Sequence, residues 1–134
     1  MSVNYECNTV ETLKHHIKRH AIVVVKLGAE WCEPCKMIAP KFSEMAENVH
    51  GNLRKFHERG MKNLPICSFI SIDIDNTCED TGQKWGEHLQ CGGVPMFLVF
   101  FNGRTENTFT GADLDPVIEC IENALQQSLQ TTAV

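Results

Sequence analysis

The chain has 134 residues, enough for one domain with a full hydrophobic core, and its apolar content of 43% is ordinary for a globular protein. The formal net charge of −5 argues against a general binder of nucleic acids or anionic membranes, and no apolar stretch reaches the ~18 residues of a transmembrane helix. The N-terminus lacks a secretory signal pattern, and Glu6 and Glu11 argue against an intact mitochondrial presequence. We expect a single domain over residues 1–134, located in the cytoplasm or, if a presequence has been removed, in an organelle.

Seven cysteines could indicate a secreted disulfide framework. Their odd number, the missing signal and the adequate core instead favour a reducing compartment. Two of them form the pair Cys32-x-x-Cys35. The other five lie mostly in apolar or helical surroundings, where a free cysteine behaves as a small buried hydrophobe: Cys7, Cys67, Cys78, Cys91 and Cys120.

The first predicted helix begins at a capping box formed by Asn8 and Glu11. Its end is basic and contains three histidines, of which His16 and His20 have the i, i+4 spacing that can ligate a metal. No carboxylate or cysteine completes such a site, so a solvated basic helix end is the favoured interpretation. We expect no metal and no cofactor.

A buried strand is predicted over the β-branched run Ala21–Leu27, and a helix is predicted from Pro34 to about Val49. Cys32 therefore falls at a strand-to-helix turn, where free N–H groups and the helix dipole favour a thiolate, the reacting form of cysteine. Pro34 suits the first helical turn, because its missing N–H costs nothing there. Cys35, one turn later, should lie deeper and be less accessible. This asymmetry predicts that Cys32 attacks and Cys35 resolves.

The segment 50–65 is locally basic within an acidic protein, since it contains Arg54, Lys55, Arg59 and Lys62. Gly51 and Gly60 bracket a piece that is consistent with a short helix whose inward side chains are Leu53, Phe56 and Met61. A solvated surface insertion is the favoured interpretation. The alternative is a docking patch for an acidic partner.

Residues 66–74 predict a second buried strand, and Asn76 or Thr77 is expected to cap a third helix that ends at about His88. The following segment, 86–92, brings Cys91 and two glycines to the residues before Pro95. A thiol sensor that uses Cys91 is one hypothesis, and an unreactive thiol that points into the core is the favoured alternative.

Asn102-Gly103 predicts the turn of a hairpin between the strands Met96–Phe101 and Thr105–Thr110. Asp115-Pro116 opens the last helix, and the polar residues 126–134 are expected to fray. The elements together predict an α/β protein, a mixed sheet with helices on both faces and a right-handed crossover.

The sequence Trp31-Cys32-Glu33-Pro34-Cys35-Lys36 after a hydrophobic strand resembles the thioredoxin family. The similarity continues in the family's order from about Val10 to Leu129, with matches at Pro40, 69–75, Gly93-Val94-Pro95, 100–103 and Gly111. The resemblance implies the thioredoxin fold, which is a central mixed β-sheet flanked by helices, with Pro95 in the cis form.

The resemblance also implies the function of a protein dithiol–disulfide oxidoreductase that reduces substrate disulfides through Cys32 and Cys35. Substrate-binding positions are then Trp31, Glu33, Pro34, Val94 and Pro95. Implied partners are disulfide-containing proteins and, as electron donor, a reductase or a low-molecular-weight dithiol, with the chain acting as a monomer. The alternative is a thioredoxin-like binding or scaffold module with residual redox activity. A zinc site would need a second cysteine pair, which is missing.

Several positions depart from the family's pattern. Lys26 stands where thioredoxins carry a buried aspartate that relays a proton, and Ser71 replaces a strand lysine that neutralises that acid. Lys26 is therefore a candidate modulating residue, either as a neutral amine that moves a proton or as a cation that favours thiolates; plain packing of its stem is the third possibility. Glu33 replaces a glycine and should oppose the thiolate, and Gly28 replaces an aromatic residue and should widen the space near the pair.

Overall fold

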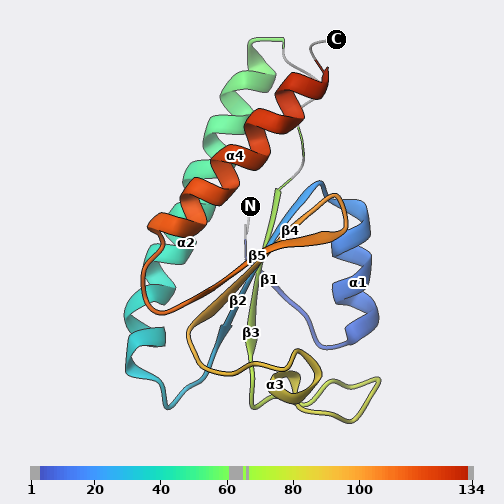
Figure 1. Cartoon of the computed structure of the whole chain (residues 1–134), viewed down its shortest axis with the longest axis vertical. Coiled ribbons are helices and arrows are strands. Elements are labelled where there is room, and N and C mark those ends of the chain that lie inside the picture. Colours follow the sequence, from blue (N-terminus) through green and yellow to red (C-terminus); the bar gives the residue numbers. More distant parts are fainter. Residues whose placement is uncertain (1–3, 61–64, 66, 133–134) are drawn as a thin grey trace.

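The structure is a computed structural model that describes residues 4–60, 65 and 67–132 (Figure 1). Five strands and four helices are seen in this part of the chain. In chain order they are β1 (Asn4–Glu6), α1 (Val10–Arg19), β2 (Ile22–Gly28), α2 (Glu33–Glu58), β3 (Cys67–Asp73), α3 (Trp85–His88), β4 (Met96–Phe101), β5 (Arg104–Thr110) and α4 (Asp115–Thr132).

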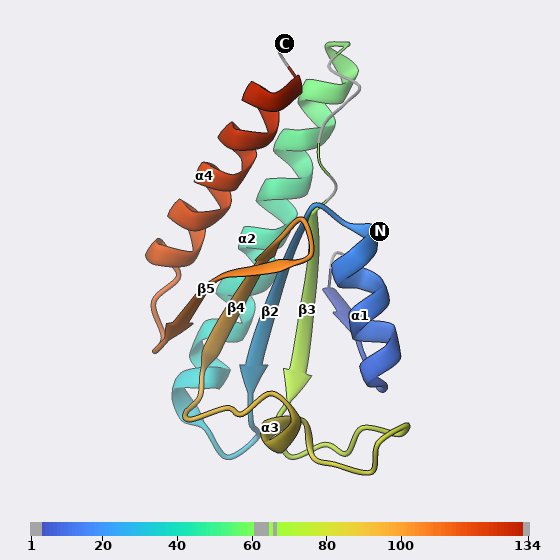
Figure 2. The ribbon, with the colours of Figure 1, turned by 45° about the vertical axis from the view of Figure 1, so that its right-hand side comes forward.

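The strands form one mixed sheet in the order β1-β3-β2-β4-β5, seen side by side in Figure 2. β1, β3 and β2 are parallel, whereas β4 and β5 pair antiparallel with their neighbours. The turn between β4 and β5 contains Asn102 and Gly103, both with positive φ, which confirms the hairpin. β1 was not predicted, because three residues are too few for a periodic signal.

Helices cover both faces of the sheet, as the sequence predicted. Alternation along β2 directs Val24 towards α2 and α4, where it joins a buried cluster with Phe42 and Phe69. Val23 and Val25 point to the opposite face and pack with the side chains of α1 and with Trp85. This three-layer arrangement confirms the expected α/β fold.

α2 is longer than predicted and runs without interruption through Pro40 and Gly51 to Glu58. A glycine inside a helix costs only about 1 kcal/mol, and Val49 and Leu53 compensate by packing on the buried cluster beside α4. The prediction of a separate short helix was therefore wrong. The predicted inward orientation of Phe56 was also wrong, because Phe56 is 41% exposed. Met61 and Lys62 lie outside the described residues.

The start of α1 differs from the prediction, because Thr9 and not Asn8 is the N-cap. The Oγ1 atom of Thr9 accepts a hydrogen bond from the Thr12 amide at 3.0 Å. The carboxylate of Asp80, distant in sequence, accepts from the amides of Val10 and Glu11 at 3.0 and 3.2 Å. A tertiary contact thus supplies the acceptors that the capping box would have provided.

The predicted helix at 76–88 is wrong over most of its length, since only α3 is helical. Residues 76–84 form a loop closed by a bridge between Thr77 and Lys84. The loop packs on the beginning of α1, where the Glu79 amide donates to the Asn8 carbonyl at 2.9 Å and Cys78 is fully buried. At the C-terminus, α4 continues to Thr132 and therefore includes most of the polar residues that were expected to fray.

Candidate active site

The two cysteines lie at the junction of β2 and α2 and are joined as a disulfide, with their Cα atoms 5.2 Å apart. Cys32 is the N-cap of α2, and its Sγ accepts a hydrogen bond from the Cys35 amide at 3.2 Å. Pro34 occupies the first turn, where an N–H would have no helical partner. The fold therefore directs the Cys35 amide, in the first turn of the helix, at the sulfur of Cys32.

The prediction that Cys35 lies deeper than Cys32 was wrong. Cys32 is 5% exposed and Cys35 is 7% exposed, so Cys35 is not the deeper residue in the oxidised pair. The disulfide ties the two side chains together, and they form one small cluster with Ala29, Ile74 and Val94. The difference between the cysteines lies in their positions on the helix.

An exposed apolar rim surrounds the pair. Trp31 is 66% exposed, and its indole N–H donates to Oδ2 of Asp75 at 2.8 Å, which fixes the ring beside the disulfide. Met37, two residues after Cys35 on α2, is 69% exposed. On the other side, the carbonyl oxygen of Val94 lies 3.8 Å from Sγ of Cys32, and the Val94–Pro95 peptide bond is cis, as the resemblance implied.

The charge of Glu33 is partly balanced within the motif itself. Its carboxylate accepts a hydrogen bond from the Lys36 ammonium at 3.2 Å, and both side chains are exposed. Because exposed ion pairs contribute little to stability, the main consequence is electrostatic: a cation accompanies the acid beside Cys32. The expected opposition to the thiolate is correspondingly smaller.

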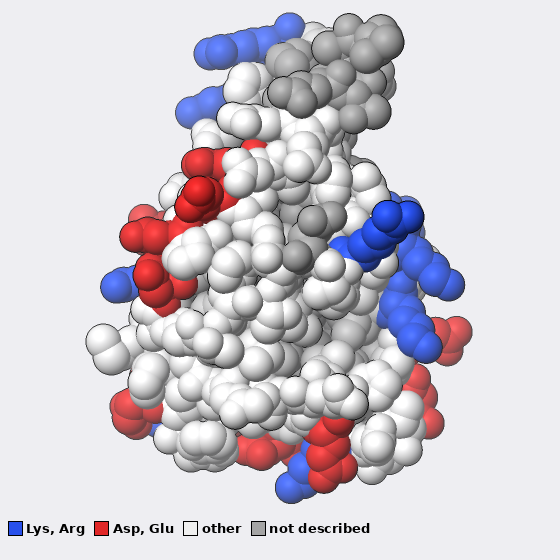
Figure 3. Space-filling model, in the orientation of Figure 1, with Lys and Arg blue, Asp and Glu red and all other residues white. Residues whose placement is uncertain are grey.

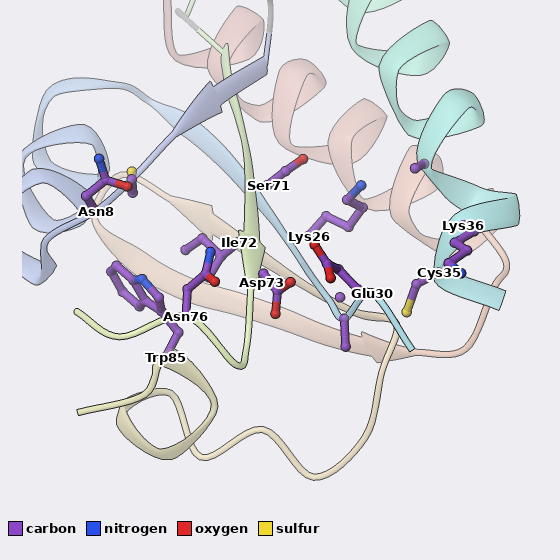
Figure 4. A pocket seen from close by; sticks show the side chains of 14 residues that line it. Asn8, Lys26, Glu30, Cys35, Lys36, Ser71, Ile72, Asp73, Asn76 and Trp85 are labelled. Atoms are coloured by element: carbon purple, nitrogen blue, oxygen red, sulfur yellow. The ribbon is translucent and has the colours of Figure 1, made fainter. Parts of the chain in front are cut away.

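A cavity of about 350 Å³ lies behind Cys35 (Figure 4). Its lining includes Lys26 and Ser71, adjacent in the β2–β3 register, together with the carboxylates of Glu30 and Asp73. Gly28 also lines it, and a Cβ at that position would lie 3.6 Å from both Cβ and Sγ of Cys35. The missing side chain of Gly28 thus leaves the cavity open towards Cys35.

Lys26 is half-buried in this cavity. Burial lowers the pKa of its ammonium group, because removal from water disfavours the charged form. The Nζ atom lies 5.4 Å from the centroid of the Phe42 ring, where a cation–π contact offsets part of that cost. Lys26 and Cys35 thus line the same cavity, and the three possibilities for Lys26, proton transfer, a cation that favours thiolates and packing of its stem, all remain open.

The remaining cysteines have varied surroundings. Burial raises the pKa of Cys7 to about 11 and that of Cys67 to about 12, so both thiols are poor nucleophiles at neutral pH. Cys91 is half-buried, its thiol donates to the Gly93 carbonyl at 3.2 Å, and it packs against the cluster that contains Trp85. Within the segment before Pro95, the residue that contacts the disulfide is Val94.

Sequence analysis missed Asp75, which holds Trp31, and the exposed position of Met37. The pairing of Trp31 with Asp75 could not be predicted, because it depends on how the end of β3 lies beside the start of α2. The two aspartates at the end of the predicted strand, Asp73 and Asp75, could have indicated that polar side chains gather there. At the far end of α1, His16 and His20 have ring centroids 5.4 Å apart, and no group of three potential metal ligands occurs among the described residues. No helix in the part of the chain that the structure describes is long and apolar enough to cross a bilayer.

Comparison with known proteins agrees with this geometry. Residues 4–123 match the family model described as Thioredoxin. Thioredoxin from Pseudomonas aeruginosa is 34% identical over 96 residues, which cover 72% of this chain and 71% of that protein. The chloroplastic Thioredoxin F of rice is 31% identical over 101 residues, which cover 75% of this chain but only 44% of the relative.

A solved structure shows the same fold. Plasmodium falciparum thioredoxin superposes with a TM-score of 0.66 and 25% identity, covering 88% of this chain and 96% of the other. The matching family model, the sequence relatives and the cysteine pair at the start of α2 all agree. The chain belongs to the thioredoxin family and carries in Cys32–Cys35 the redox pair of a dithiol–disulfide oxidoreductase.

Proposed function

We propose that Cys32 is the attacking cysteine and Cys35 the resolving cysteine in the reduction of protein disulfides. The observation that carries this assignment is the position of Cys32 at the N-cap of α2, with the Cys35 amide donating to its sulfur. Both the amide and the helix dipole stabilise negative charge on Sγ. Cys35, inside the first turn, faces the cavity with Lys26.

The reaction proceeds in two exchanges. The Cys32 thiolate attacks one sulfur of the substrate disulfide, the substrate S–S bond breaks, and the other substrate sulfur leaves as a thiolate. The Cys35 thiolate then attacks Sγ of Cys32, which breaks the mixed disulfide and releases the second substrate thiolate. Two electrons pass to the substrate, and Cys32–Cys35 remains as the disulfide. A reductase or a low-molecular-weight dithiol returns those electrons.

The substrate is a disulfide-containing protein whose extended segment lies across the rim of the pair. The exposed ring of Trp31 and the side chain of Met37 offer apolar contact on one side. The backbone of Val94, beside Cys32, offers hydrogen bonds on the other side, as in strand addition. Glu33, Pro34 and Pro95 complete the contact surface.

Lys26 handles the proton of the resolving step. Burial lowers its pKa, which increases the share of neutral amine able to accept the Cys35 thiol proton. The shared cavity supports this role and also admits water as an alternative carrier. Lys26→Ala is therefore expected to slow resolution moderately and to shift its pH profile; an unchanged profile would leave Lys26 with packing alone.

The proposed functional unit is a monomer with a single domain over residues 1–134, and the proposed compartment is the cytoplasm. An adequate core and five cysteines without disulfides support a reducing compartment. An organelle is the alternative, supported by the chloroplastic relatives. Sedimentation and imaging of the tagged full-length protein test these assignments.

The deciding experiment is the reduction of insulin disulfides. The assay uses dithiothreitol as the electron donor first and is then repeated with a reductase as the donor. The wild type should accelerate insulin reduction, Cys32→Ser should abolish it, and Cys35→Ser should accumulate mixed disulfides visible on non-reducing gels. Cys120→Ser is the matched control, because this thiol lies on α4, outside the site. Equal residual activity in the Cys32 and Cys35 variants would contradict the roles, and an inactive wild type would favour a binding or scaffold module.

A further inference from the structure

A second apolar surface lies far from the disulfide. The later part of α2 and the facing side of α4 enclose a groove of about 500 Å³. Its apolar lining combines buried and half-buried side chains with the exposed ring of Phe56: Met45, Val49, Leu53, Phe56, Ile118 and Leu125. At 1.5 Å per residue, Phe56 is roughly 30 Å from Cys35 along α2. A partner at the Phe56 end of this groove would therefore lie far from a substrate at the disulfide.

The shape of the groove suits a helix. On α2, the positions Met45, Val49, Leu53 and Phe56 follow one another at intervals of one helical turn, and Ile118, Ile121 and Leu125 do so on α4. A third helix can pack into an apolar groove between two helices at an interaxial distance of 8–10 Å. Between Glu44 and Phe56 the groove is roughly 18 Å long, enough for about three helical turns.

The charges on the rim define the partner's polar face. Glu44, Asp115 and Glu122 line the groove and are exposed, with Lys41 as the cation among the lining residues. None of the three carboxylates forms an ion pair within the described part of the chain. Figure 3 shows acidic side chains gathered on the left-hand edge of the molecule, over α2 and α4, whereas basic side chains lie at the upper end of α2 and on the right-hand side near α1. The rim is therefore complementary to lysine and arginine.

We propose that this groove docks a basic amphipathic helix of a partner protein. Apolar residues of that helix at i, i+3, i+4 and i+7 would cover Leu53, Phe56 and Ile118. Basic residues about two turns apart would meet Asp115 and Glu122, which have that separation on α4. The proposal does not depend on disulfide exchange, because both cysteines are outside the groove.

The test is an NMR titration of the full-length oxidised protein with a synthetic helical peptide of about 15 residues, whose faces carry leucine and lysine. The lysine peptide should shift amide signals of residues 44–56 and 114–125. A matched peptide with glutamate in place of lysine should bind about tenfold more weakly. Shifts outside the groove, or equal affinity for the two peptides, would overturn the proposal.

Two variants separate docking from general attraction to an acidic protein. Glu122→Lys should weaken binding by about fivefold, whereas Glu119→Lys, exposed on the same helix but not lining the groove, should change it by less than about twofold. Phe56→Ser should weaken binding by about tenfold, because it removes apolar surface that the peptide covers. Equal losses for Glu119→Lys and Glu122→Lys would contradict a defined site.

Other occupants give different results. If a second copy of this chain occupies the groove, the wild type sediments as a dimer and Phe56→Ser as a monomer, and the proposal fails. If the wild type floats with phosphatidylserine vesicles and Phe56→Ser does not, the groove binds a membrane and not a partner helix, and the proposal also fails. Cys32→Ser should bind the lysine peptide as tightly as the wild type, so this proposal can stand or fall separately from the redox function.

Discussion

The space beside Cys35 can be tested by adding one methyl group with Gly28→Ala. The new Cβ would lie 3.6 Å from Cβ and Sγ of Cys35, which is ordinary van der Waals contact, and Gly28 does not have a positive φ. The methyl group therefore fits without displacing its neighbours. It also restricts the unfolded chain, an effect of about 0.4–1 kcal/mol. We expect the free energy of unfolding of the oxidised protein to rise by about 1 kcal/mol.

Gly86→Ala is the matched control, because the same methyl group meets a filled space there. Its Cβ would lie 3.1 Å from Cβ of Ile74 and 3.3 Å from the backbone oxygen of that residue. The oxygen cannot move without shifting the end of β3. The overpacking exceeds the entropic gain, so we expect a net loss of about 1 kcal/mol.

Urea unfolding followed by far-ultraviolet circular dichroism measures both changes, and melting temperatures should move by about 4 °C in opposite directions. Gly28→Ala should also retain insulin reduction, since the methyl group contacts Cys35 from the cavity side. A destabilised Gly28→Ala protein, or a Gly86→Ala protein at least as stable as the wild type, would refute the steric reasoning.

Three further expectations concern ionisable groups. Lys26→Met should raise the free energy of unfolding at neutral pH by about 1 kcal/mol, because it replaces a half-buried ammonium by an apolar group. Since burial lowers the pKa of Lys26 in the folded state, wild-type stability rises with pH between the folded and unfolded pKa values; urea unfolding should show a flatter alkaline limb for the variant, and equal slopes would contradict this. Hydrogen bonds from the α1 backbone hold the pKa of Asp80 below its usual value, so its stabilising effect is present above the unfolded pKa and is lost as pH falls through the folded pKa. Asp80→Ala should therefore flatten the acid limb of stability and speed hydrogen exchange in the first turn of α1, and unchanged exchange would exclude the capping role. After mild oxidation, mass spectrometry should find Cys91 free while Cys32 and Cys35 are paired; a disulfide or glutathione adduct on Cys91 would instead support a sensor thiol.

Much of the fold follows from local sequence patterns. The β-branched run before the cysteine pair and the Asn102-Gly103 turn each specify their structures within a few residues. Cys32 could be placed at the start of a helix for the same reason, because Pro34 and the apolar spacing after it are local signals. The redox pair was therefore accessible to sequence reasoning before any contact was known.

Other features depend on contacts between distant parts of the chain. Thr9 is the N-cap of α1, but two further amides of its first turn donate to Asp80, about 70 residues away in sequence. Residues 76–84, which contain Asp80, form a loop closed by a bridge and not the predicted helix. The continuation of α2 past Gly51 depends on packing beside α4, which local propensity at a glycine does not reveal.

The sequence alone predicted the fold class and the position of Cys32 at the start of a helix, because periodicity, turn residues and helix-start signals act over a few neighbouring residues. Only the tertiary structure decided that Lys26 and Cys35 face one cavity and that α2 and α4 enclose a second groove. Cavities form where elements distant in sequence fail to fill the space between them. Their shape depends on the packing of the whole chain, and not on any single segment.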